Sequence, residues 1–251
     1  MTTTPNTTTH EIADGIYRLS TCIPDITPDG FTFNQYLVAG DEPLLFHCGP
    51  RASFPLVSAA VARVLPLERL RWITFGHVES DECGSMNSWL AAAPSAQVVF
   101  NGLGCMVSVG DLADRAPRAV ADEEVLDIGG HRIRFLVTPH VPHGWEAQVI
   151  LDETTGTLFC GDLLAQTGNP PAIVHGTDIV SPALAAEGMF RGTCLTAATA
   201  PTIRRLAGLA PRTLALMHGP AYAGDGAAAL HALADGYADL FDRSQEEVAV
   251  R

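Results

Sequence analysis

Three side chains that can bind a metal alternate along one short stretch of this sequence. His77, Glu79 and Asp81 come directly after the apolar run Trp72–Phe75. In an extended segment, alternate side chains point to the same face. A strand that ends here would therefore aim an imidazole and two carboxylates into one cavity. A lone histidine is more often a surface or core residue, but this spacing at a strand exit indicates a metal site.

Further ligand-type residues occur in the same kind of context later in the chain. His140 follows the apolar run 133–137, Asp162 follows closely after 158–160, and His218 follows 214–217. We therefore expect four strand ends to deliver ligands to one place. The candidate ligands are His77, Glu79, Asp81, His140, Asp162 and His218.

This order of motifs resembles the metallo-β-lactamase superfamily. It is most similar to the di-iron branch, which contains the flavodiiron proteins and the stand-alone oxygen-binding di-iron proteins. Hydrolases of the superfamily usually carry His-x-His-x-Asp-His where this chain has His77-x-Glu79-x-Asp81-Glu82. The resemblance spans about residues 11–241 and implies an α+β fold, an αββα sandwich with the metal loops along one edge.

The residue pattern also indicates two strand-rich halves with helices between them. Gly129-Gly130 and the segment 154–156 each separate two apolar runs, which is typical of β-hairpins. Helices are expected over 54–65, 86–93, 182–190 and 197–206, and a last helix carries an apolar stripe from Leu230 to Phe241. We expect a disordered tail over residues 1–10 and a single di-iron domain over 11–251.

Composition excludes several classes of partner. The chain has 251 residues, 47% of them hydrophobic, and a formal net charge of −13. A phosphate backbone requires a basic face, so neither nucleic acid nor an anionic membrane is expected as a partner. The sequence contains no apolar run long enough to span a bilayer and does not begin like a signal peptide. We expect a cytoplasmic protein whose six scattered cysteines are reduced.

The resemblance also implies how the ligands are shared between two metals. One metal takes His77, Glu79, His140 and Asp162, and the other takes Asp81, Asp162 and His218, with Asp162 as the bridge. Three neutral imidazoles and three carboxylates carry a charge of −3, which suits two ions with an oxo or hydroxo bridge. Glu79 stands where zinc hydrolases have a histidine, and this carboxylate favours iron. Zinc and manganese are the less favoured alternatives.

Several neighbouring residues have two readings. Glu82 is either a hydrogen-bonded carboxylate or a seventh ligand in the open position of the second metal. His143 is the candidate proton donor or a surface residue, and His47 is either buried or a partner that orients a ligand. Trp145 and Tyr36 are expected in the core. The remaining histidines, His10, His131, His175 and His231, are expected to be structural or exposed.

The leading functional hypothesis is a non-haem di-iron oxidoreductase that binds O₂ or NO and reduces or activates it. Neither a flavodoxin domain nor a glycine-rich nucleotide loop is recognisable in the sequence. Electrons would then come from a separate reductase or a reducing co-substrate. The alternatives are a dinuclear zinc hydrolase of a lactone, thioester or phosphoester, and a non-catalytic O₂ or NO sensor. A homodimer is one candidate assembly, and the sequence does not decide the oligomeric state.

Overall fold

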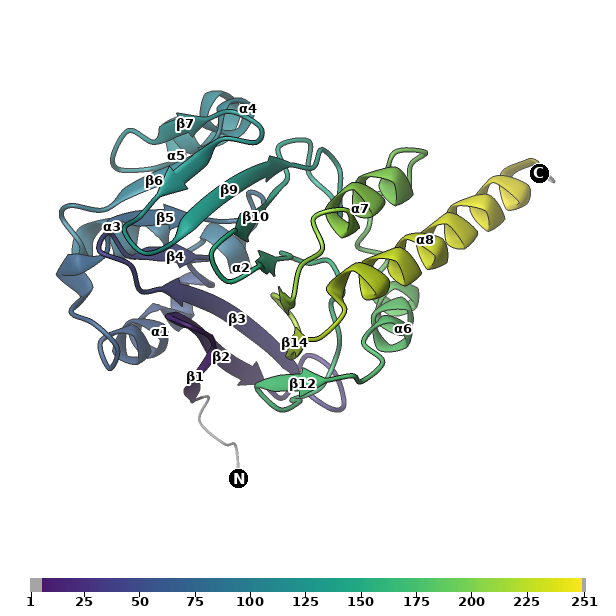
Figure 1. The fold of residues 1–251 in the computed structure, drawn as a ribbon, viewed down its shortest axis with the longest axis horizontal. Coiled ribbons are helices and arrows are strands. Elements are labelled where there is room, and N and C mark those ends of the chain that lie inside the picture. Colours follow the sequence, from purple (N-terminus) through teal and green to yellow (C-terminus); the bar gives the residue numbers. More distant parts are fainter. Residues whose placement is uncertain (1–5, 250–251) are drawn as a thin grey trace.

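The computed structural model describes residues 6–249 and consists of two β-sheets packed face to face, with helices on their outer sides (Figure 1). This arrangement confirms the predicted αββα sandwich. The N-terminal half of the chain forms one sheet and its helices, and the C-terminal half forms the other. Two strand-rich halves therefore produce two layers that share one interior.

The first sheet has seven strands in sequence order. Strands β1 to β4 pair antiparallel, and β4 to β7 pair parallel. The strands are β1 (Thr7–Ala13), β2 (Ile16–Ile23), β3 (Phe31–Val38), β4 (Leu44–Phe46), β5 (Trp72–Thr74), β6 (Gln97–Asn101) and β7 (Arg118–Val120).

The second sheet also has seven strands, in the order β12-β14-β13-β11-β10-β9-β8. Two of its antiparallel pairs, β8–β9 and β10–β11, are hairpins that confirm both predicted turns. The strands are β8 (Val125–Asp127), β9 (Arg132–Val137), β10 (Gln148–Asp152), β11 (Thr157–Phe159), β12 (Ile173–His175), β13 (Thr213–Ala215) and β14 (Ala221–Ala223).

The helices are mostly short and lie between the strands. The α-helices are α1 (Phe54–Val61), α2 (Ser80–Cys83), α3 (Met86–Ala92), α4 (Gly102–Gly104), α5 (Gly110–Leu112), α6 (Val180–Phe190), α7 (Thr199–Ala207) and α8 (Gly226–Ala249). Two 3₁₀-helices, η1 (Arg51–Ser53) and η2 (Leu67–Arg69), and a π-helix, η3 (Cys105–Val109), complete the set. Within residues 6–249, no helix combines the length and hydropathy needed to cross a bilayer.

Three buried clusters hold these layers together. The central cluster fills the space between the sheets and joins Tyr36 and Phe46 of the first sheet to Phe135 and Phe159 of the second. An outer cluster packs α1 and α3 on the first sheet, and another packs α6, α7 and α8 on the second. Burial of apolar surface in these three clusters stabilises the stacked sheets and helices.

The N-terminal segment differs from the prediction. Residues 7–10, expected in a disordered tail, belong to strand β1, which pairs with β2 from Thr7↔Thr21 onward. Residues 1–5 lie outside the described residues. The β-branched Thr7, Thr8 and Thr9 suit a strand, and the buried Thr7 Oγ1 lies 2.7 Å from Thr21 Oγ1. The polar composition concealed a strand because it lies at the sheet edge.

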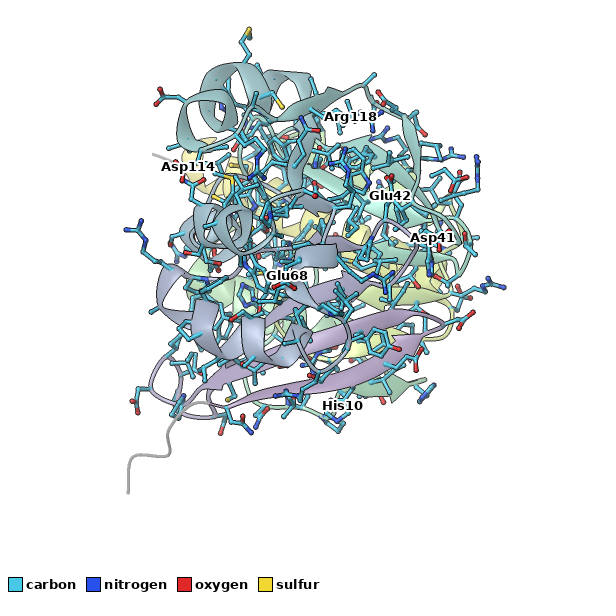
Figure 2. The ribbon with its side chains drawn as sticks, turned by 90° about the vertical axis from the view of Figure 1, so that its left-hand side faces the viewer. His10, Asp41, Glu42, Glu68, Asp114 and Arg118 are labelled. Carbon is cyan, nitrogen blue, oxygen red and sulfur yellow. The ribbon has the colours of Figure 1, made fainter. Side chains whose placement is uncertain are left out.

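The face turned toward the viewer in Figure 2 carries acidic and basic side chains that are dispersed rather than gathered into a site. His10 is exposed on β1, as expected for a histidine outside the site. Glu42 accepts a 2.9 Å hydrogen bond from Trp72 Nε1, and the Arg118 guanidinium lies 5.5 Å from the Trp72 ring. These contacts cover the end of β5 opposite to the proposed ligands.

We expect Phe159→Ala to destabilise the protein by about 3–5 kcal/mol, because it opens a cavity between the sheets. Phe159 is fully buried and its ring centroid lies 5.6 Å from Tyr36 and 5.4 Å from Phe46. The measurement is urea unfolding of the metal-free protein. Met106→Ala, at a side chain that is 75% exposed, is the matched control. Equal stability of the two variants would contradict this account of the core.

Candidate metal centre

Four potential ligands converge at one edge of the sandwich. Donor atoms of His77, Glu79, His143 and Asp162 all lie within 4.8 Å of one another. Glu79 Oε2 is 2.8 Å from His77 Nε2 and 3.0 Å from His143 Nε2. The Asp162 Oδ2 atom is 3.8 Å from the first of these nitrogens and 3.7 Å from the second. Two imidazoles and two carboxylates thus surround one point.

A second group shares Asp162 with the first. His218 Nε2 lies 3.3 Å from Asp162 Oδ1 and 3.5 Å from Asp81 Oδ2. The two carboxylate oxygens of Asp162 therefore face different imidazoles, Oδ2 toward His77 and His143 and Oδ1 toward His218. This is the geometry that a carboxylate between two metal positions requires.

Strand ends deliver most of these side chains. His77 follows β5, Asp162 follows β11 and His218 follows β13, because parallel pairing brings the carboxyl ends of β11 and β13 to one edge. Glu79 and Asp81 lie at the start of the short helix α2. His218 is fixed from behind, since its Nδ1 lies 2.7 Å from the Thr32 carbonyl oxygen. Its Nε2 is left to face the carboxylates.

The loop after β9 presents His143 in place of His140. His140 is exposed, and its backbone nitrogen donates to the Gly144 carbonyl at 2.7 Å. Thr138 Oγ1 donates to the Val141 carbonyl at 2.9 Å, so the chain turns immediately after the strand. This turn directs His140 away and returns His143 to the site. The prediction of His140 as a ligand therefore has no support in the geometry, and His143 lies inside the group rather than at its border.

Glu82 does not occupy the open position predicted as one of its two roles. Its carboxylate is fully buried and lies behind His77. Oε2 accepts hydrogen bonds from the backbone nitrogens of Gly76, at 2.5 Å, and His77, at 2.8 Å. Oε1 lies 3.1 Å from His77 Nδ1 and 3.4 Å from His47 Nε2. The hydrogen-bonded reading of Glu82 is the one that the structure supports, and His47 is its buried neighbour.

The remaining aromatic and histidine predictions fall outside the site. Tyr36 is buried in the core as expected, whereas Trp145 is 54% exposed rather than buried. His131 is buried and its Nδ1 lies 2.9 Å from Asp152 Oδ2, while His175 and His231 are exposed. All six cysteines are free, and burial raises the pKa of the Cys83 thiol to about 11. The thiols beside the site are thus held as neutral groups.

The carboxylates perturb the imidazoles strongly. Burial by itself would lower the pKa of His77, but the nearby Glu82 and Glu79 carboxylates raise it to about 12. Burial opposes the same change at His218, where the nearby Asp162 and Asp81 carboxylates raise the pKa to about 10. Hydrogen bonds from His143 and His77 hold the pKa of the Glu79 carboxyl well below its ordinary value. The imidazoles and carboxylates of this centre therefore surround a point where a positive charge is favoured.

The donor set fits metal ions. Asp81 Oδ1 and Asp162 Oδ1 are buried, and among the described residues neither has a hydrogen-bond partner. An unsatisfied buried carboxylate oxygen is costly unless a cation neutralises it. Oxygen-rich sites with imidazoles suit first-row transition metals. His77, Glu79, His143 and Asp162 would hold one ion, and Asp81, Asp162 and His218 would hold a second.

A cavity of about 220 Å³ opens over these ligands. The donors Glu79, Asp81, His143, Asp162 and His218 form one wall. The other wall is largely apolar and consists of residues that the sequence analysis missed, chiefly Phe31, Ala183, Ala186, Phe190, Thr193 and Tyr237. Tyr237 belonged to the predicted apolar stripe of the last helix. Nothing in its spacing distinguishes a cavity residue from a core residue.

Comparison with known proteins places this arrangement in a family. The family model described as "ODP family beta lactamase" matches residues 31–219, which contain all the ligands named above. The chain belongs to this family. The family model, and curated relatives named as coenzyme F420H₂ oxidase and diflavin flavoproteins, confirm the predicted resemblance to the di-iron branch of the metallo-β-lactamase superfamily. Solved structures of flavodiiron cores share the fold.

Individual relatives are distant in sequence and close in fold. The coenzyme F420H₂ oxidase of Methanothermobacter marburgensis is 29% identical over 168 residues, covering 62% of this chain and 41% of the relative. The structure of rubredoxin oxygen:oxidoreductase from Desulfovibrio gigas has a TM-score of 0.79 at 17% identity, over 94% of this chain and 62% of that one. A fragment of putative diflavin flavoprotein A 5 from Nostoc sp. has a TM-score of 0.77 at 19% identity, over 98% of this chain and 99% of that one. The chain thus spans less than half of the oxidase.

Metal uptake by the metal-free protein should release protons. With a pKa of about 12 at His77 and about 10 at His218, both rings are protonated at pH 7, whereas a metal needs the neutral imidazole. Because binding expels protons, affinity should rise with pH, by about tenfold per pH unit for each proton released. Calorimetric titration with Zn²⁺ in buffers of different ionisation enthalpy measures the number of protons released per metal ion bound. His218→Ala should release fewer protons, and a pH-independent affinity would contradict the electrostatic account.

Proposed function

We propose that this protein is a non-haem di-iron oxidoreductase that binds O₂ or NO and reduces or activates it with electrons from a separate donor. The single observation that carries the proposal is Asp162, whose two oxygens face two different imidazole groups beneath one cavity. When bound, two iron ions would supply redox chemistry and open coordination positions for a small ligand. A reductase or a reducing co-substrate would supply electrons.

The choice of iron rests on the carboxylate at position 79. Glu79 lies within hydrogen-bond distance of both His77 and His143, so it forms part of the first ligand group. Three carboxylates in the complete set make the site hard and anionic, which favours iron over zinc. His143 takes the ligand role first proposed for His140, and Glu82 remains behind the site.

The cavity suits a small uncharged ligand. It holds about 220 Å³, and its described lining contains neither lysine nor arginine that could neutralise an anionic substrate. Glu187 adds a further carboxylate at its wall. Apart from the metals themselves, the site therefore offers an anionic phosphoester little attraction. Apolar walls of phenylalanine and alanine allow O₂ or NO to reach the ligands and limit the water beside them.

Metal analysis tests the ligand set. We expect wild-type protein from iron-replete cells to contain about two irons per chain. Asp162→Ala should lose most of both, because it removes the oxygen donors shared by the two groups. Two equivalents of zinc without iron would contradict the assignment of the metal. Full metal retention in Asp162→Ala would contradict the assignment of the ligands.

The exchange of His140 for His143 gives a matched pair of variants on one loop. His143→Ala should lower the iron content toward about one per chain, since the first group loses an imidazole. His140→Ala should retain the wild-type content, because this side chain is exposed and outside the group. Optical spectra and elemental analysis of both proteins decide the question. The reverse pattern would restore His140 as the ligand.

Reaction with O₂ tests the activity. Chemically reduced, iron-loaded protein should consume O₂ or NO in stopped-flow mixing, and should turn over repeatedly only with an added reductase or reductant. Uptake without steady-state turnover would identify a sensor instead. A reduced protein that is inert toward both gases and hydrolyses an ester or lactone would overturn the oxidoreductase proposal.

A further inference from the structure

We propose that Glu82 is the positioning residue of the first metal group, and that it orients His77 by accepting the proton of Nδ1. This inference rests on the proposed function only in treating His77 as a metal ligand. A ring held at Nδ1 by a carboxylate keeps Nε2 free for a metal and fixes the plane of the imidazole. His47 acts through Glu82 and not on the metals.

The geometry of Glu82 places it outside the cavity. Its side chain is fully buried and does not line the cavity, and among the described residues Oε1 has no partner with full hydrogen-bond geometry. Oε2 accepts from the nitrogens of Gly76 and His77, so it ties the backbone that leaves β5. Oε1 lies 3.1 Å from His77 Nδ1, so the same carboxylate sets the ring as well as the backbone. One side chain thus controls both the position and the orientation of His77.

His47 is a second imidazole next to the Glu82 carboxylate. It is fully buried, and its Nε2 lies 3.4 Å from Glu82 Oε1, an ion-pair distance longer than a good hydrogen bond. Its Nδ1 is 3.3 Å from the Asn34 carbonyl oxygen on β3. The imidazole is therefore held between the first sheet and Glu82. A buried carboxylate without such a partner would be costly, so His47 keeps Glu82 in place for His77.

Glu146 provides a matched control. It is buried like Glu82, and its Oε1 accepts a 3.1 Å hydrogen bond from the backbone nitrogen of Val78. It therefore holds the residue that directly follows the two, Gly76 and His77, whose nitrogens Glu82 binds. Among the described residues no imidazole lies within ion-pair distance of its carboxylate. If a substitution merely disturbs the loop, the variants at Glu82 and Glu146 should show the same effect. If Glu82 orients His77, only the Glu82 variant should lose that orientation.

The experiment compares Glu82→Gln with Glu146→Gln in the full chain. We expect Glu82→Gln to weaken Zn²⁺ and Co²⁺ binding about 10–100-fold, because the amide cannot reproduce the carboxylate on all of its donors. Glu146→Gln should bind like wild type. Long-range ¹⁵N–¹H NMR of the zinc-loaded protein should show a slowly exchanging Nδ1 proton on His77 in wild type and control, and its loss in Glu82→Gln. Wild-type affinity together with an unchanged His77 signal in Glu82→Gln would overturn the proposal.

His47→Gln keeps the proposal testable if Glu82→Gln does not fold. If His47 acts through Glu82, its replacement should weaken metal binding and broaden the His77 Nδ1 signal. In a foldable double variant the two losses should not add. If His47→Gln keeps the wild-type His77 signal and the wild-type metal affinity, His47 does not act on His77 through Glu82. Zinc and cobalt replace iron throughout, and the Nδ1 signal is read in metal-free protein too. A protein without iron or O₂ chemistry would therefore refute the proposed function and leave this test intact.

Discussion

Repulsion among three carboxylates at one edge of the sandwich is the constraint on which the site depends. Glu79, Asp81 and Asp162 face one cavity, and Asp162 approaches both imidazole groups. Without a cation, protonated imidazoles balance this charge: the Asp162 and Asp81 carboxylates raise the pKa of His218, and the Glu82 and Glu79 carboxylates raise that of His77. Metal ions and protons on the imidazoles are therefore alternative ways to neutralise the same carboxylates, and binding of one displaces the other. The fold holds the carboxylates together, and a cation bound there would make that arrangement favourable.

The general architecture was predictable because local patterns agreed with it. The turns at Gly129-Gly130 and 154–156 joined antiparallel strands, and the apolar stripe of the last helix packs in the outer cluster. The three-residue strands β12 and β14 were not predicted, whereas β11, of the same length, was recognised from the apolar run next to its turn. The polar strand β1 was missed for a different reason. Its pairing with β2 depends on tertiary contacts that threonine-rich composition does not reveal.

The candidate ligands were predictable where a strand end alone decides the direction of a side chain. This condition holds at His77, Asp162 and His218, each of which directly follows or nearly follows a strand. It fails after β9, where the Thr138 turn reverses the chain before the site is reached. Spacing along the sequence favoured His140, and only the path of the loop selects His143. The roles of Glu82 and His47 were equally open, because they depend on which side of His77 the carboxylate lies.

The contact between Glu82 and the end of β5 explains a requirement for glycine. A Cβ atom at Gly76 would lie 3.0 Å from both oxygens of Glu82, closer than such contacts normally are. Gly76 therefore allows the carboxylate to approach the backbone nitrogens of residues 76 and 77 at hydrogen-bond distance. Moving Glu82 outward to make room for a side chain would lengthen its contact with His77 Nδ1. Gly76 and the Glu82 carboxylate six residues later thus depend on each other, and the candidate ligand His77 lies between them.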